Sequence, residues 1–479
     1  MKTRKLVPFI AILASTTLCS CGFLKMDFNF TDKIRELFKE PKREEQQQSG
    51  VNEEIVTPEK KYKYTVMYYM SGSTLEYDKD MGFGGGDRRQ GYMTDDIKEI
   101  LSVNFGNDVK VIIQTGGVKH YALETSSCWC AESTILSGKT EISDRYIQRW
   151  EVEACQEYKV DTMNARNVTL RNKLKFVAEE NYNNMAKEES LESFLKWGLK
   201  DYSADNMGVI ISGHGAGIGG CAFDDNYSED SLNAAEIALA SNNALKSYSR
   251  DKFTFLGFDC CLMACADIAT VEADYYEYMV ASQESEDAEG WRQATWLTNL
   301  VSNPQAETKT ILQKIVDSFV GSSHTMCGYT EGGRRWPCYS TLSVLDLSKA
   351  DNLVSAFENY VTAVGKNGSY YVDAYEDSYY FGEGSYGLVD FVDFLNNMDK
   401  EQEKKADVIE AIDDLVIYEK HCAEYEKSEN VTPSGVNLFF PVNLDHDYDF
   451  QVWKSDYSSS NTKFNSWNDV CISYTQGWY

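Results

Sequence analysis

Five short apolar runs, separated by segments of helical spacing, limit most strongly what this chain can fold into. Continuous apolar runs of this length are typical of strands that are buried on both faces of a parallel sheet. Their alternation with helices predicts an α/β fold with a mostly parallel sheet and helices on both faces. The predicted strands are 64–70, 108–115, 207–212, 253–258 and 278–282, and the predicted helices are 94–103, 190–202, 231–245 (with Ser231 as its N-cap) and 262–273.

Composition and charge narrow the class of protein. The chain has 479 residues, of which 43% are hydrophobic, so it can bury a large core and is not a disordered or fibrous chain. Its formal net charge of −29 speaks against sequence-independent nucleic-acid binding, which needs clustered Lys and Arg. An acidic body instead suits cationic partners or substrates.

The N-terminus has the features of an export signal. Three basic residues precede the apolar stretch 6–18, which is too short to span a bilayer as a mature helix. The following residues, 18–22 (LCSCG), resemble a bacterial lipobox, which implies cleavage before Cys21 and acylation of its thiol. We therefore predict a signal peptide at 1–20, a polar tether at 21–61 and a lipid-anchored protein of the bacterial cell envelope. The alternative is an ordinary signal peptide in which the two cysteines are incidental.

A histidine and a cysteine follow two neighbouring predicted strands. His214 lies between Gly213 and Gly215 after the strand 207–212, and Cys261 follows the strand 253–258 at the predicted start of a helix. The carboxyl ends of parallel strands meet at one edge of the sheet, so the two side chains should lie close together. A helix N-terminus would favour the Cys261 thiolate, and backbone N–H groups of Gly215 and Cys261 would stabilise an oxyanion. Such a pair can transfer acyl groups.

Taken singly, each residue has a simpler interpretation. A histidine in a glycine loop is often structural, and a cysteine in a buried segment is often packing or part of a disulfide. The chain has 13 cysteines. With Cys19 removed and Cys21 lipidated, an odd number remains in an exported protein, which is a reason to look for a reactive thiol.

Two segments resemble motifs of the clostripain family of cysteine endopeptidases. Residues 211–217 (ISGHGAG) are similar to its histidine motif, and residues 257–263 (GFDCCLM) to its nucleophile motif. Weaker matches at 64–70, 224–236 and 434–441 keep the family's order. The resemblance implies a caspase-like three-layer sandwich with a C-terminal elaboration, a His214–Cys261 dyad and cleavage after Arg or Lys. It divides the body into a catalytic core at 62–300 and a C-terminal part at 301–479 that completes the sheet and cleft.

The same resemblance suggests residues for substrate binding and maturation. Asp259 aligns with an acidic residue of the family's S1 pocket, and a carboxylate there would attract a guanidinium or ammonium group. Further S1 candidates are Asp287 and Glu289, although a solvated acidic loop is an equally good interpretation of them. Family members can cut themselves between the two motifs, where this chain has Lys246, Arg250 and Lys252 in what we expect to be an accessible loop.

No cofactor is required by the sequence. Some relatives depend on calcium, but the acids Asp224, Asp225 and Asp230 do not match an EF-hand loop, so a calcium requirement stays open. The five histidines form no metal-ligand pattern, and we predict no metal site.

Three functions are consistent with these patterns. The first is an active, lipid-anchored cysteine endopeptidase acting on peptides or proteins that contain Arg or Lys. The second is a binding lipoprotein that uses the same scaffold without catalysis. The third is an enzyme of the same fold with non-basic specificity, if the Asp259 pocket is blocked. The intact pair of His214 and Cys261, with an acid nearby, favours the first.

One further predicted element, a hairpin at 133–152, lies in the core. The others lie in the C-terminal part and are strands at 341–347 and 436–442, a helix at 386–398, and a Tyr-rich stretch at 370–386 that either packs or lines a cleft.

Overall fold

The computed structural model describes residues 58–78, 88–89, 91–118, 137, 142–161, 167–180, 184–227, 230–323, 339–382, 386–441 and 462–475. These residues belong to one compact unit, Ile55–Tyr479. The predicted signal peptide, Cys21 and almost all of the predicted tether lie outside the described residues. Among the described helices, none has the length and apolar character of a membrane span.

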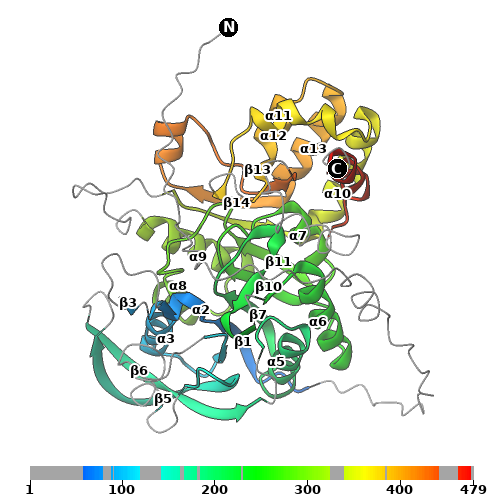
Figure 1. Ribbon diagram of the computed structural model, residues 1–479. Coiled ribbons are helices and arrows are strands. Elements are labelled where there is room, and N and C mark those ends of the chain that lie inside the picture. The colour runs from blue at the N-terminus through cyan, green and yellow to red at the C-terminus, as the bar shows by residue number, and fades with distance from the viewer. Residues whose placement is uncertain are drawn as a thin grey trace, which may run out of the picture. The chain divides into compact units, whose positions relative to one another are not determined.

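A nine-stranded sheet forms the centre of the unit (Figure 1). From one edge to the other its strands are β14 (Val416–His421), β12 (Thr341–Asp346), β11 (Tyr276–Ala281), β10 (Phe253–Asp259), β7 (Ala204–Ser212), β1 (Tyr62–Ser71), β4 (Val109–Gly116), β5 (Gln148–Asp161) and β6 (Asn167–Glu179). The five strands from β11 to β4 run parallel, and the pairs outside them are antiparallel. The sheet is therefore mixed, with a parallel centre.

Three small two-stranded sheets lie beside this one. Their pairs are β2 (Tyr77–Asp78) with β3 (Arg88–Arg89), β8 (Cys221–Asp224) with β9 (Asp230–Leu232), and β13 (Leu388–Asp390) with β15 (Asn437–Phe439).

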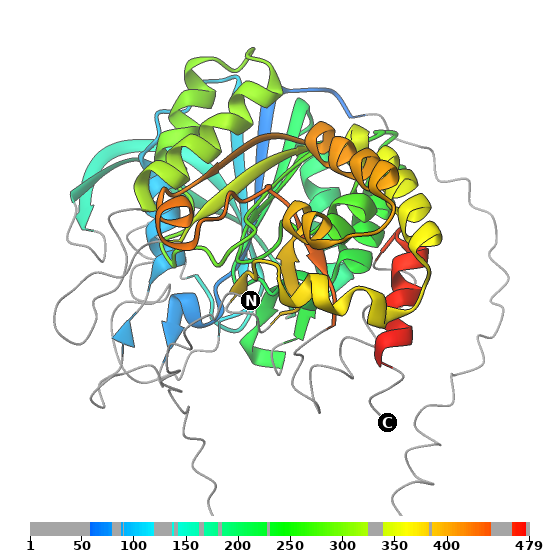
Figure 2. The ribbon, with the colours of Figure 1, turned by 90° about the horizontal axis from the view of Figure 1, so that it is seen from above.

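Helices cover both faces of the sheet, which gives the predicted three layers (Figure 2). On one face lie α3 (Tyr92–Ser102), α8 (Gln293–Ser302) and α9 (Thr308–Ser323). On the other lie α5 (Glu188–Asp201), α6 (Ala234–Ser247), α7 (Ala266–Glu272), α10 (Ala350–Val364), α11 (Val372–Glu376), α12 (Phe391–Asn397), α13 (Gln402–Leu415) and α15 (Asn465–Thr475). A short helix, α2 (Ser73–Glu76), directly follows β1.

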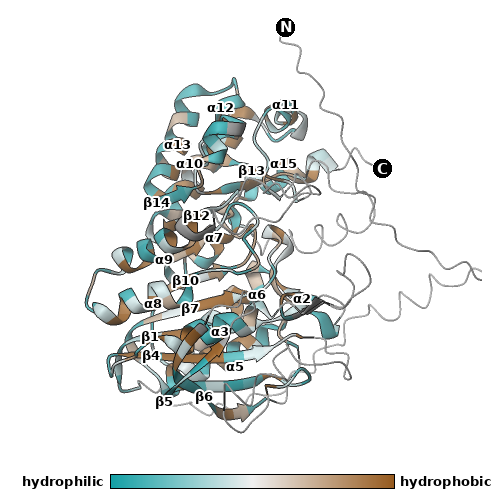
Figure 3. Ribbon diagram, turned by 90° about the vertical axis from the view of Figure 1, so that its left-hand side faces the viewer, coloured by the Kyte–Doolittle hydropathy of each residue, from teal (hydrophilic) through white to brown (hydrophobic). Residues whose placement is uncertain are grey.

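The central strands are apolar on both sides because both sides are covered. Along β1, Met67 and Tyr69 join the core under α5 and α6, whereas Tyr68 and Met70 join the core under α3 and α8. This alternation buries every residue of β1 from Tyr64 onward. Figure 3 shows the result as a band of apolar strands between more polar helix surfaces.

The helix expected at 262–273 is wrong in its first turn. Helix α7 begins only at Ala266, and the residues before it form a turn. Backbone hydrogen bonds from Ala264 N to Ser282 O (2.8 Å) and from Asn437 N to Ala264 O (2.7 Å) hold this turn to other parts of the chain. These tertiary hydrogen bonds replace the ones that a helix would have made.

Two other sequence expectations need correction, and a third lies partly outside the described residues. Ser231 does not cap a helix, because it lies on β9; α6 is capped by Asn233 in a capping box with Glu236. The β5 strand, which includes the end of the hairpin predicted at 133–152, pairs with β6, and most of the first arm of that predicted hairpin lies outside the described residues. The segment predicted as a helix at 386–398 contains β13 before α12 begins.

Strand order determines where the site can form. From β1 the chain first adds β4 on one side and later returns to add β7 on the other, so the order reverses between β1 and β7. Such a switch point leaves a crevice at the carboxyl ends of the strands, where open α/β sheets bind ligands. The register pairs Met70 with Ser212 and Ser212 with Asp259, so the segments after β1, β7 and β10 start at the same level.

Candidate active site

A cavity of about 200 Å³ lies at these strand ends. His214, two residues after β7, and Cys261, two residues after β10, both line it. The structure therefore brings both residues to one cavity at the same edge of the sheet, as predicted. The cavity is lined by Leu75, Met93, Asp96, Gly213, His214, Asp259, Cys260, Cys261, Glu286, Asp287, Ala288 and Gly290.

The glycines beside His214 are needed for close backbone approach. Gly213 has φ +151°, and a Cβ there would lie 2.7 Å from Ser71 O. A Cβ on Gly215 would lie 2.3 Å from Cys261 O, so the two loops touch. The Gly215–Cys221 bridge is flanked by hydrogen bonds from Ala216 N and Ala222 N, so it does not use the Gly215 N–H.

The ring of His214 contacts a residue that sequence reasoning missed. Thr74, in α2, places its Oγ1 2.7 Å from His214 Nε2. The residues 71–73 could be recognised in sequence only as a turn that ends a strand, and nothing in them indicates that the next hydroxyl faces a histidine.

The thiol of Cys261 is largely buried. Burial raises its pKa, the Glu286 N–H hydrogen bond (3.2 Å to Sγ) opposes this, and the charge of Glu284 adds to the rise in pKa. No helix begins at Cys261, so the predicted thiolate stabilisation by a helix N-terminus is wrong. In this arrangement the thiol is protonated and needs a base to become a nucleophile.

The backbone beside this thiol is held in an unusual conformation. Leu262 has φ +67°, a region that non-glycine residues rarely adopt. Its N–H donates to Glu284 O (3.1 Å), which ties the turn to the loop after β11. Non-glycine residues in this region often occur at functional sites.

Asp259 lies in the cavity wall, but both oxygens of its carboxylate already accept hydrogen bonds from other residues. Trp291 N donates to Oδ1 (3.0 Å), and Gln293 Nε2 donates to Oδ2 (2.7 Å). Burial, only partly offset by these hydrogen bonds, raises the pKa of Asp259 to about 6. Asp259 therefore holds the loop after β11 in place.

Two neighbouring carboxyl groups, those of Glu286 and Asp287, each have an oxygen that accepts no hydrogen bond from the described part of the chain. Within the described residues, Glu286 Oε2 and Asp287 Oδ2 are buried and have no hydrogen-bond partner. Burial raises the pKa of both carboxyls, and nearby Asp259 and Glu289 respectively add to the rise. Asp96 reaches the same cavity from α3, and burial likewise raises its pKa well above the usual range. Glu286 and Asp96 were not among the sequence candidates, although Glu286 lies in the acidic loop from which the others were chosen.

Two groups of predicted residues lie away from the cavity. Glu289 does not line it and forms an ion pair with Arg292 at 2.7 Å. In the acidic segment, Asp224 accepts backbone N–H groups of Met185 and Asn226, and Asp230 pairs with Lys187. No set of three or more potential metal ligands is found among the described residues.

The predicted self-processing residues lie around the turn between α6 and β10. Lys246 is exposed in the last turn of α6. Arg250 is partly buried and donates to three backbone carbonyls, those of Lys252, Ala204 and Asp205. Lys252 Nζ donates to Ala273 O at 2.5 Å. The turn is surface-accessible at Ser249, but the Arg250 side chain is held against the body.

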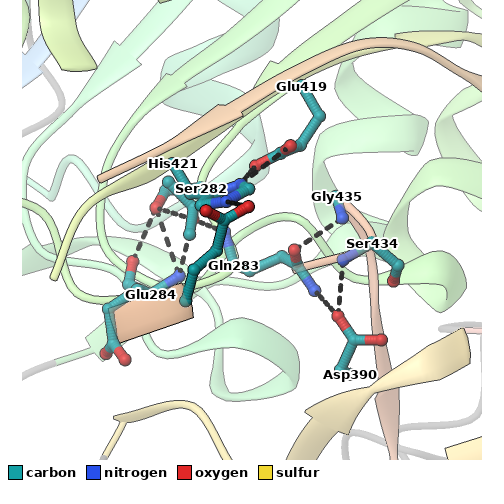
Figure 4. A network of polar contacts seen from close by, with 10 residues as sticks. Ser282, Gln283, Glu284, Asp390, Glu419, His421, Ser434 and Gly435 are labelled. Carbon is teal, nitrogen blue, oxygen red and sulfur yellow. Dashed lines mark hydrogen bonds and ion pairs between the residues drawn. The ribbon is translucent and has the colours of Figure 1, made fainter. Parts of the chain in front are cut away.

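A buried polar network connects the loop after β11 to the C-terminal part (Figure 4). Gln283 donates from Nε2 to Asp390 Oδ2 (3.1 Å) and Asn437 Oδ1 (3.0 Å), and it accepts Gly435 N–H at 2.6 Å. Asn437 returns a hydrogen bond to Gln283 O at 2.9 Å. Residues beyond 300 thus fix the start of the segment that carries Glu286 to the thiol.

Comparison with known proteins agrees with this arrangement. The family model described as the clostripain family matches residues 84–474. No curated protein sequence matches the chain significantly.

Solved structures show the same fold at low sequence identity. A secreted C11 cysteine protease from Bacteroides thetaiotaomicron, named iotapain, is 15% identical with a TM-score of 0.56 over 85% of this chain and 100% of its own. The secreted C11 protease of that organism in complex with an irreversible peptide inhibitor has 12% identity and a TM-score of 0.55, over 83% of this chain and 99% of its own. An inactive zymogen C11 protease from Parabacteroides distasonis has 18% identity and a TM-score of 0.55, over 87% and 99%. The caspase-like three-layer fold is thereby confirmed, and with a family match over most of its length the chain belongs to the clostripain family of cysteine peptidases.

Proposed function

We propose that this chain is an exported cysteine endopeptidase that cleaves peptide bonds after Arg or Lys. The observation that carries this proposal is that a single cavity is lined by a thiol, an imidazole and four carboxyl groups: Cys261, His214, Asp96, Asp259, Glu286 and Asp287. A thiol and an imidazole can cleave an amide, and carboxyls beside them can hold a cationic side chain.

In the proposed reaction, His214 takes the proton of the Cys261 thiol. The thiolate attacks the carbonyl carbon of the scissile bond, and the imidazolium gives the proton to the leaving amine as the C–N bond breaks. Water, deprotonated by the neutral imidazole, then hydrolyses the thioester and regenerates the thiol. The N–H groups of Gly215 and Cys261 are the proposed oxyanion donors.

The proposed specificity rests on the carboxyls with unoccupied acceptor positions. Glu286 Oε2 and Asp287 Oδ2 are buried without a partner among the described residues, whereas each oxygen of Asp259 already accepts an N–H donor. A guanidinium or ammonium group would satisfy the two open oxygens, and its positive charge would favour their ionised forms. We therefore assign direct substrate contact to Glu286 and Asp287, and a supporting role to Asp259.

A panel of fluorogenic peptides tests this function. The peptides differ only at the residue before the scissile bond, which is Arg, Lys, Leu or citrulline, the last being a neutral analogue of arginine. We expect hydrolysis of the Arg and Lys peptides, with citrulline slower by about 100-fold because it lacks the charge. Preferred cleavage after Leu would support the non-basic alternative. Tight binding of all peptides without hydrolysis would support the binding lipoprotein.

Two finer features belong to the same proposal. One is the lipid anchor at Cys21, supported by the lipobox-like residues 18–22, and the other is self-cleavage near Lys246, Arg250 or Lys252. Intact-mass measurement of the exported wild-type and Cys261→Ala proteins tests both. A lipid adds the same mass to both proteins, whereas self-cleavage produces fragments only from the wild type. Identical unmodified masses would contradict both features.

A further inference from the structure

The segment after β1 places a hydroxyl group, that of Thr74, beside the imidazole of His214, the candidate base. Thr74 Oγ1 lies 2.7 Å from His214 Nε2, and the two residues follow the neighbouring strands β1 and β7, on either side of the switch point. A neutral imidazole has one N–H group and one lone pair, so the partner of one nitrogen decides what the other can do.

Three hydrogen bonds fix the segment that carries Thr74. Ser71 Oγ donates to Phe223 O (2.7 Å), and Gly72 N donates to Gly116 O (3.0 Å). Ser73 Oγ donates to Asp225, and Ser73 has φ +43°, which a non-glycine residue rarely adopts without a local constraint. The hydroxyl of Thr74 is thus held in position by its surroundings.

The end of α2 is fixed as firmly as its beginning. Glu76 is fully buried, and its carboxylate accepts Thr94 N at 2.9 Å. Its carbonyl accepts Gly91 N at 2.8 Å, which joins α2 to the start of α3. Both ends of this short helix are therefore attached to the body of the protein, with Thr74 between them.

We propose that Thr74 is a positioning residue for His214. Its hydroxyl oxygen accepts a hydrogen bond from the Nε2–H group, which selects the tautomer whose Nδ1 carries the lone pair that can take the Cys261 proton. When His214 becomes an imidazolium, the same hydrogen bond becomes charge-assisted and stronger. The interaction therefore favours the thiolate–imidazolium state over the neutral pair, and this role rests on the proposed function of His214 and Cys261.

Two substitutions separate this role from a purely structural one. Thr74→Val keeps the shape of the side chain and removes the hydroxyl, whereas Thr74→Ser keeps the hydroxyl. We expect Thr74→Val to lower kcat for the Arg peptide by about 10- to 100-fold with little change in KM, and Thr74→Ser to retain most of the activity. Thr298→Val is the matched control, because Thr298 is exposed on α8 and its hydroxyl donates only within that helix, to Ala294 O.

Alkylation of Cys261 gives a readout that does not depend on peptide hydrolysis. The rate of its modification by iodoacetamide, followed by peptide mass mapping from pH 5 to 8, reports the thiolate population. We expect Thr74→Val to slow this modification in the lower part of the range, and Thr74→Ser and Thr298→Val to follow the wild type.

The outcomes distinguish this proposal from the proposed function. An active wild type whose kinetics and alkylation are unchanged by Thr74→Val would overturn the role of Thr74 alone. Equal losses in the Val and Ser variants, accompanied by lower melting temperatures, would overturn it as well, because they would show a packing role. If the wild type hydrolyses no peptide, the endopeptidase proposal fails, and the alkylation profiles still decide whether Thr74 supports the pair.

Discussion

Replacing Cys261 with alanine is expected to lower kcat/KM for Arg and Lys peptides by about 10⁴-fold or more. Removing the attacking atom of a catalytic pair lowers the rate by a factor of this size, because no covalent intermediate can form. The effect should appear in kcat, since the carboxyls that bind the substrate are unchanged. Initial rates on the fluorogenic Arg peptide, with the variant in large excess over trace protease contamination, measure it.

The matched control for this variant is Cys155→Ala. Cys155 is, with Cys261, one of two partly exposed free cysteines among the described residues, but it lies on β5, away from the cavity. The Cys155→Ala variant should retain wild-type rates and wild-type sensitivity to alkylating reagents. Equal rates for wild type and Cys261→Ala would show that Cys261 is not the nucleophile. Loss of activity in Cys155→Ala would show that removing a cysteine outside the cavity is enough to disturb the folded structure.

The second large effect is expected from the double variant Glu286→Gln, Asp287→Asn. It keeps the size of both side chains, and the backbone N–H of residue 286 that donates to the thiol is unaffected. Loss of the two carboxyls should lower kcat/KM for the Arg peptide by about 100-fold, mainly through KM, while the citrulline peptide changes little. The selectivity for arginine over citrulline, measured as a ratio of kcat/KM values, should therefore largely disappear.

KM for the Arg peptide should depend on pH in the wild type, and this dependence should be weaker in the double variant. Burial raises the pKa of Glu286, Asp287 and Asp259, the last to about 6. Below their raised pKa values Glu286 and Asp287 hold protons that a cationic side chain must displace, so KM for the Arg peptide should fall as the pH rises above the ordinary carboxyl range. KM for the citrulline peptide should change less over the same range.

Glu289→Gln is the control for both measurements. Its carboxylate pairs with Arg292 and does not line the cavity, although it belongs to the same acidic loop. A loss of arginine selectivity in Glu289→Gln as large as in the double variant would mean that the charge of the whole loop, and not direct contact with Glu286 and Asp287, determines specificity.

The sequence predicted the central strands and the shared edge of His214 and Cys261 because both depend on local patterns. Apolar runs identify buried parallel strands, and adjacent parallel strands place their carboxyl ends side by side. Residues 207–212 and 253–258 were predicted as strands, and β7 and β10 contain both.

What the sequence could not predict depends on contacts between distant segments. The apolar residues from 262 onward have helical spacing, but hydrogen bonds to Ser282 and Asn437 hold the backbone of Ala264 in a turn. Likewise, the position of Asp259 beside the nucleophile gave no sign that Trp291 and Gln293 would occupy its carboxylate. Tertiary hydrogen bonding of this kind overrides local propensity and leaves no periodic signal.

The pairing of β7 with β10 has a consequence for a chain cut in the turn between α6 and β10. The two strands are hydrogen-bonded neighbours from Phe255–Gly208 to Asp259–Ser212, and α6 packs on both α5 and α7. Severing the covalent link would leave these contacts in place. A nicked molecule would therefore persist as a noncovalent two-chain assembly, in which the imidazole belongs to one polypeptide and the sulfur to the other.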